Sequence, residues 1–159
     1  YLNAEKALLL CLTLLSGLGI ANGLPMAATI IAPDISPAMG QLGTTFGGNH
    51  LACAAAIAVL EVIHNEKLMV NAAEIGTFLM KELSGMTGVT EVRGKGLMIG
   101  VEFDMDICQL RQKLLFDEKI FTGYAGVYTL RLLPPLCFTM EHAQLFLSSL
   151  KKLLGKNKW

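Results

Sequence analysis

The chain has 159 residues, of which 53% are hydrophobic and only 16% are charged, and its 13 basic residues balance its 13 acidic ones. This length supports one full domain or parts of two, and the absence of a basic block argues against a nucleic-acid-binding protein. The mean hydropathy of +0.51 is too high for a small monomer. We therefore expect part of the surface to pack on a second copy, a complementary polypeptide or a membrane.

The N-terminal segment carries no charge from residue 7 to residue 33. Its leucine-rich run over residues 7–15 resembles the core of a signal peptide or a short membrane helix. The run is too short to span a bilayer, and Gly17 and Gly19 would disrupt a longer helix. We favour a buried helix or strand here, and keep a membrane or export role for residues 7–32 as the alternative.

A glycine-rich loop over residues 43–49 leads into an alanine-rich helix predicted over 50–64. Thr44 and Thr45 offer two hydroxyls beside the helix N-terminus, where free N–H groups and the helix dipole favour an anion. The alternative is an ordinary loop in which a Thr or Asn side chain caps the helix. The spacing alone favours the ordinary loop.

The remaining elements are predicted from hydrophobic periodicity and from turn and capping residues. They are a strand over 24–32, a helix from an Asn65 cap to about 83, strands over 89–93 and 97–103, a helix from an Asp104 or Asp106 cap to about 118, strands over 120–122 and 129–133, and a helix from a Thr139 cap to about 154. From residue 89 onward this order predicts a small α+β sandwich with its helices on one face of the sheet.

Arg131 stands mid-strand among leucines, just before two prolines. We expect its side chain to be buried, and a buried guanidinium requires an anion. That anion could be a bound carboxylate, which suits the planar guanidinium, or a structural Asp or Glu. The spacing does not choose between the two.

The cysteines and histidines show no metal-ligand spacing, so the sequence predicts no metal site. Scattered cysteines without pairing motifs predict reduced, mostly buried thiols and a cytoplasmic protein. The residues concerned are Cys11, Cys53, Cys108, Cys137, His50, His64 and His142.

Four segments, in this order along the chain, resemble motifs of class III (subgroup II) pyridoxal-phosphate (PLP) aminotransferases, the ornithine and acetylornithine aminotransferase group. They are residues 20–25, 43–56, 91–100 and 129–136, and the resemblance covers about residues 19–153. It implies an α/β fold, made of the end of the large PLP-binding domain of a fold type I enzyme and a small C-terminal α+β domain.

The resemblance implies a division of the chain into a large-domain remnant (1–64), a connecting helix (65–88) and the small domain (89–159). It also implies amino-group transfer between an N-acylornithine, or a similar ω-amine, and 2-oxoglutarate through PLP, in a homodimer. Arg131 would bind the substrate's α-carboxylate. Thr44 and Thr45 would bind cofactor, with Thr45 reaching the phosphate held by the neighbouring subunit, and Arg93 would have a structural role at the domain junction.

The chain departs from the family at the position of the Schiff-base lysine, which Leu18 occupies, or Ser16 if the loop is shifted by two residues. No lysine lies between Lys6 and Lys67. The family's first phosphate loop, ring-stacking aromatic and pyridine aspartate also have no counterpart here. We therefore expect the chain alone to be inactive and to hold no covalent PLP. The alternative is a non-catalytic fragment that pairs with another chain.

Overall fold

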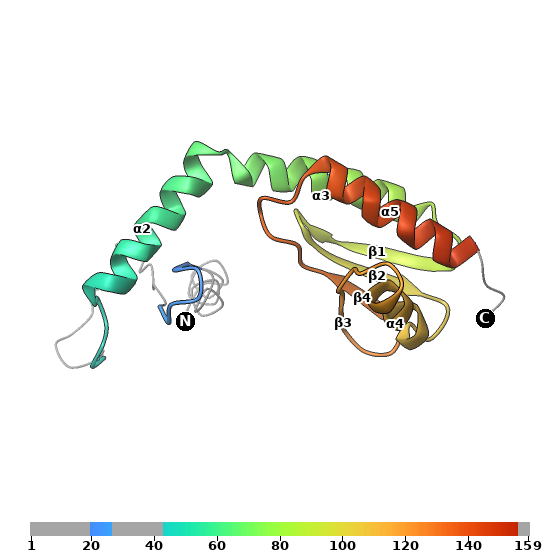
Figure 1. The fold of residues 1–159 in the computed structure, drawn as a ribbon, viewed down its shortest axis with the longest axis horizontal. Helices are drawn as coiled ribbons and strands as arrows, with labels where there is room; N and C mark the ends of the chain where they lie inside the picture. The colour runs from blue at the N-terminus through green and yellow to red at the C-terminus, as the bar shows by residue number, and fades with distance from the viewer. Residues whose placement is uncertain (1–19, 27–42, 156–159) are drawn as a thin grey trace, which may run out of the picture. The chain divides into compact units, whose positions relative to one another are not determined.

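The computed structural model describes residues 20–26 and 43–155, which fall into two compact units, Tyr1–Glu66 and Lys67–Trp159 (Figure 1). Each unit is described by itself. The domain boundaries predicted from the resemblance stay a prediction. The strand predicted over 24–32 lies mostly outside the described residues, and its first part, residues 24–26, is not in a strand.

The first unit contains helix α2 (His50–Asn65), as the sequence predicts. The Asn49 side chain caps it, because its Oδ1 accepts a hydrogen bond from the Ala52 N–H at 2.9 Å. The predicted Asn65 cap of the next helix is wrong, since Asn65 is the last residue of α2. Helix α3 (Leu68–Ser84) instead begins after Lys67, which adopts a left-handed conformation with φ of 52°.

The second unit is built on a four-stranded antiparallel sheet in the order β1-β2-β4-β3. Its strands are β1 (Val89–Lys95), β2 (Met98–Phe103), β3 (Gly123–Tyr124) and β4 (Thr129–Leu132). Strand β1 runs two residues further than predicted. The strand predicted over 120–122 is wrong, because the pairing with β4 begins only at Gly123.

Helices α3 and α5 (Met140–Gly155) lie side by side across one face of this sheet (Figure 1), which confirms the predicted placement of these two helices. Helix α4 (Cys108–Phe116) packs on α5 and adds Leu110 and Leu114 to the same core. The N-cap of α4 is Ile107 and not the predicted Asp104 or Asp106, although the Asp106 carboxylate accepts from the Cys108 N–H at 2.7 Å. The Thr139 hydroxyl accepts from the His142 N–H at 3.3 Å, so the predicted capping residue begins α5.

The core follows the alternation of side chains along the central strands. Ile99, Val101, Leu130 and Leu132 are buried under the helices, whereas the residues between them point to the opposite face. Helix α3 approaches the β1–β2 turn closely at Gly76, where a Cβ would overlap the carbonyl oxygen of Gly96.

Within residues 20–26 and 43–155, no helix has the length and apolar character needed to cross a membrane, and no group of three His, Cys, Asp or Glu residues could hold a metal ion. Residues 7–32, on which the membrane alternative depends, lie mostly outside this part of the chain. The three described cysteines are free thiols. Cys108 and Cys137 are exposed, so the expectation of mostly buried thiols is wrong for them.

Candidate functional site

The face of the sheet opposite the helices α3 and α5, here called the open face, carries the chemistry-bearing side chains of the second unit. One row of paired residues crosses all four strands and reads Arg93 (β1), Gly100 (β2), Arg131 (β4) and Gly123 (β3). Residues paired across neighbouring strands share a face. The row therefore places two arginines on the open face and a glycine on either side of Arg131.

Arg131 is exposed, so the expectation that it is buried is wrong. The reason is the alternation along β4: Leu130 and Leu132 occupy the core positions, and the residue between them must point the other way. The side chain lies over Gly123, since a Cβ on that glycine would stand 3.1 Å from Arg131 Nε and 3.5 Å from Nη2.

Arg131 makes no side-chain hydrogen bond or ion pair with any other residue of the part of the chain that the structure describes. The structural Asp or Glu that the sequence allowed as its partner is therefore not found among those residues. None of its N–H groups donates to an acceptor among the described residues, so all of them are available to a bound ligand.

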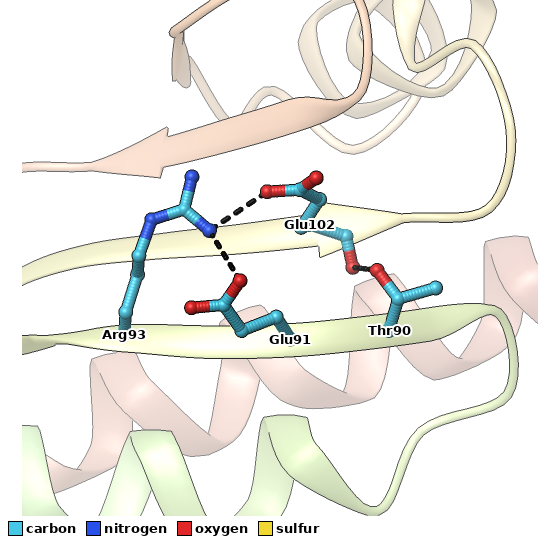
Figure 2. Close-up of polar contacts among 4 residues, drawn as sticks. All are labelled: Thr90, Glu91, Arg93 and Glu102. Atoms are coloured by element: carbon cyan, nitrogen blue, oxygen red, sulfur yellow. Dashed lines mark hydrogen bonds and ion pairs between the residues drawn. The ribbon is translucent and has the colours of Figure 1, made fainter.

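Arg93, in the same row, forms ion pairs with two carboxylates. Its Nη1 donates to Glu102 Oε2 at 2.7 Å and to Glu91 Oε2 at 3.0 Å, and Figure 2 shows both carboxylates converging on this guanidinium. The hydrogen bond that Arg93 donates to Glu102 and the negative charge of Glu91 raise the pKa of Arg93 above its ordinary value. Both partners belong to β1 and β2, so Arg93 ties these two strands together on the open face.

A cavity of about 580 Å³ lies beside Arg131, between the α4–β3 connection and the β4–α5 connection. Its lining combines two cations, Arg131 and Lys119, and the polar His142, Cys137 and Thr122 with a majority of apolar side chains. The apolar part consists of Leu79, Ile120, Phe121, Leu132, Leu133, Pro134, Pro135, Phe138, Leu145 and Phe146. A cavity with apolar walls and a few polar groups, two of them cations, is the expected form of a site for a small organic anion.

Asn71, which the sequence analysis did not single out, holds one wall of this cavity. Its Nδ2 donates to the carbonyl oxygens of Leu136 and Phe138, at 3.0 Å each. These bonds fix the segment between β4 and α5 against helix α3. The available signal was a polar residue in the first turn of a helix whose next residues, Ala72 and Ile75, are buried.

The glycine-rich loop belongs to the first unit, whereas the site residues named above belong to the second unit. Thr44 and Thr45 are both exposed, and their side chains make no hydrogen bond to another described residue. Gly48 adopts φ of 72°, and a Cβ on Gly47 would overlap Thr44 Cγ2. Asn49 caps α2 as the ordinary alternative predicts, and this leaves both threonine hydroxyls uncommitted. Leu18 and Ser16 lie outside the described residues.

Comparison with known proteins gives a consistent assignment. The family model "Aminotransferase class-III" matches residues 12–154. Acetylornithine aminotransferase 1 of Bordetella bronchiseptica is 40% identical over 131 residues, which are 79% of this chain and 33% of that protein. Acetylornithine aminotransferase of Methanosarcina acetivorans is 43% identical over 124 residues, 77% of this chain and 31% of that protein.

Solved structures agree with these sequence relatives. The ornithine aminotransferase of Toxoplasma gondii matches with a TM-score of 0.75 at 30% identity, over 86% of this chain and 35% of that one. The acetylornithine aminotransferase of Elizabethkingia anophelis matches with a TM-score of 0.72 at 28% identity, over 87% of this chain and 39% of that one.

The chain thus spans about a third of the length of the curated relatives it matches. Its mixed helices and sheet form one part of the aminotransferase fold, which confirms the predicted fold class. The family model covers nearly the whole chain, and the sequence and structural relatives agree with it. The chain belongs to the class-III aminotransferase family.

Proposed function

We propose that this chain is the C-terminal part of a PLP-dependent aminotransferase that exchanges an amino group between an N-acylornithine, or a similar ω-amine, and 2-oxoglutarate. The family model and the acetylornithine aminotransferase relatives support this assignment. The observation that carries it is the exposed Arg131 guanidinium, which lies over Gly123 beside the cavity without a partner among the described residues.

In this proposal Arg131 binds and orients a substrate carboxylate. A guanidinium presents two parallel N–H groups to the two oxygens of a carboxylate, and this bidentate geometry fixes direction as well as distance. Gly123, on the β3 side of the row, has no side chain and leaves room for the guanidinium over that strand. The apolar wall near it, which includes Phe121 and Leu133, would exclude water from the rest of a bound substrate.

The donor set of the first unit fits the phosphate end of PLP. Thr44 and Thr45 offer exposed hydroxyls on a glycine-rich loop at the N-terminus of α2, where the helix dipole favours an anion. When bound, PLP supplies an electron-withdrawing ring that makes amino-group transfer possible. We assign Thr44 and Thr45 to its phosphate, with Thr45 acting on the cofactor of a neighbouring subunit.

The covalent end of PLP does not fit this chain. The sequence offers no amine between Lys6 and Lys67, and Leu18 stands at the family's lysine position. The catalytic amine must therefore be supplied by another polypeptide if turnover occurs, and we propose that this chain alone is inactive.

The proposal includes a partner, either a second copy or a polypeptide that carries the remaining part of the fold. Helix α2 exposes large apolar side chains at Leu51 (71%), Ile57 (56%) and Leu60 (52%). An apolar surface of this kind marks an interaction site. Sedimentation at micromolar concentration tests this, and a stable monomer would contradict it. A purely structural role in such a complex is the second candidate, and this same surface supports it.

Binding of 2-oxoglutarate to the purified chain tests the role of Arg131. We expect the amide signals of residues around Arg131 to shift on titration in the NMR spectrum. Arg131→Gln should abolish these shifts, and Arg131→Lys should weaken binding by about two- to threefold because the bidentate geometry is lost. Lys95→Gln is the matched control, since Lys95 is an exposed cation at the end of β1. Equal affinities of Arg131→Gln and the parent chain would refute the proposal.

A further inference from the structure

Glu102 stands between the two arginines of the open face. It pairs with Thr129 of β4 in the sheet, one step along the same face from the Gly100–Arg131 pair. Diagonal neighbours on one face of an antiparallel pair are within reach of long side chains. The register therefore places Glu102 where its carboxylate could pair with Arg93 or with Arg131.

The structure shows which pair forms. Arg93 Nη1 donates to Glu102 Oε2 at 2.7 Å, so the Glu102 carboxylate is paired with an arginine of β1 (Figure 2). The Arg131 guanidinium lies over Gly123 of β3 and makes no ion pair with a described residue.

Two features keep the Glu102 carboxylate away from the Arg131 guanidinium. Arg93 donates to both Glu91 and Glu102, so the carboxylate that could reach Arg131 is already hydrogen-bonded. Gly123 has no side chain, and this leaves the space over β3 that the Arg131 guanidinium occupies. Of the two acidic residues in the described strands, Glu91 lies on β1, two strands away from β4, whereas Glu102 lies on β2, next to β4.

We infer that Arg93 is a positioning residue of the substrate site: by holding Glu102 toward β1, it keeps Arg131 available for a substrate carboxylate. This inference rests on the proposed function of Arg131. It assigns Arg93 a task in ligand binding in addition to tying β1 to β2, and it makes Glu102 an internal competitor of the substrate.

The test is a double-mutant cycle on the full 159-residue chain, with 2-oxoglutarate as the probe. In Arg93→Gln the Glu102 carboxylate is released and competes for Arg131, and exposed ion pairs of this kind change binding by about two- to fivefold. Arg93→Gln should therefore weaken 2-oxoglutarate binding by that factor. Arg93→Gln combined with Glu102→Gln should restore it, because the competitor is gone.

Lys95→Gln is the matched control for loss of one positive charge from β1 and should weaken binding less than Arg93→Gln. Arg93→Lys retains a cation opposite Glu102 and should bind more tightly than Arg93→Gln. A weakening equal to that of Lys95→Gln, or a double variant that does not recover, would overturn the inference.

A second readout needs no ligand and separates this inference from the proposed function. The Nε–Hε NMR signal of Arg131, identified by its absence in Arg131→Lys, should move in Arg93→Gln and return in the double variant. If that signal stays unchanged in Arg93→Gln, the inference fails whatever the ligand data show. If it moves while Arg131→Gln has no effect on 2-oxoglutarate binding, the inferred competition stands and the proposed substrate role of Arg131 fails.

Discussion

Gly123 determines where the Arg131 guanidinium can lie, and replacing this glycine tests the site directly. A Cβ at this position would stand 3.1 Å from Arg131 Nε and 3.2 Å from the Arg131 carbonyl oxygen. Ordinary van der Waals contact begins near 3.4 Å, so each neighbour must retreat by a few tenths of an ångström. The guanidinium can do so because it ends a flexible side chain, and we expect Gly123→Ala to shift it by that amount and change its orientation over β3.

The expected magnitude follows from the hydrogen bonds of a bound carboxylate. A displaced guanidinium keeps its charge but loses the alignment of one of two charge-assisted bonds, each of which contributes about 1.5–3 kcal/mol when well formed. The site is open to water, so we take a loss of about 0.5 kcal/mol, which corresponds to an affinity about twofold weaker. The free energy of unfolding should fall by less than about 1 kcal/mol, because the backbone needs only a small adjustment.

Gly100→Ala is the matched control, since Gly100 flanks Arg131 on the other side of the same row. A Cβ there would have ordinary contacts, at 3.6 Å to Thr129 Cγ2 and 3.7 Å to Arg93 Cγ. Neither glycine has a left-handed φ, so alanine fits both backbones. Titration of both variants with 2-oxoglutarate should show weaker binding for Gly123→Ala alone. Equal affinities, or equal losses, would refute the assigned position of the guanidinium.

Three further outcomes are expected. Gly76→Ala should lower the free energy of unfolding by about 3 kcal/mol in urea titrations, because its Cβ would overlap the Gly96 carbonyl oxygen. The control Gly85→Ala, whose Cβ would have its nearest contact at 3.8 Å, should change the free energy of unfolding little. Equal effects of the two variants would contradict the packing of α3 on the β1–β2 turn. The purified chain, reduced with borohydride without added PLP, should show no phosphopyridoxyl adduct in the mass spectrum, and an adduct mapped to any lysine would contradict this expectation. Leu18→Lys should give no measurable transamination with glutamate by this chain alone, because an amine without the rest of the cofactor site lacks positioning and charge stabilisation. Robust activity of this variant would show that the chain holds more of the cofactor site than we propose.

Much of the fold could be predicted because its signals are local. Helix α2, the caps at Asn49 and Thr139, and strands β2 and β4 follow from periodicity and capping residues. Strand β3 could not be predicted, because only two residues pair and one of them is Gly123. Its position depends on the hydrogen bonds of β4, which is a tertiary effect that a local pattern does not contain.

The environment of Arg131 was the main feature that the sequence misrepresented. Leucines at 130, 132 and 133 made the strand look buried on both faces, although alternation alone assigns residue 131 to the face opposite Leu130 and Leu132. Which face is covered depends on where α3 and α5 pack. The partnership of Arg93 with Glu91 and Glu102 likewise depends on the register between β1 and β2, which includes an irregularity between Val89 and Glu91.

The exposure of Arg131 connects this site to the rest of the fold. An ion pair in open water contributes only about 0–1 kcal/mol, so a carboxylate on Arg131 would be bound weakly while the open face is wet. Covering that face lowers the local dielectric and strengthens the same pair. Met98, Phe121 and Leu133, near Arg131, are 64%, 79% and 56% exposed and offer apolar surface for such a cover. Since the relatives are about three times longer than the matched region, we expect substrate affinity at Arg131 to rise when a polypeptide carrying the remaining fold is bound.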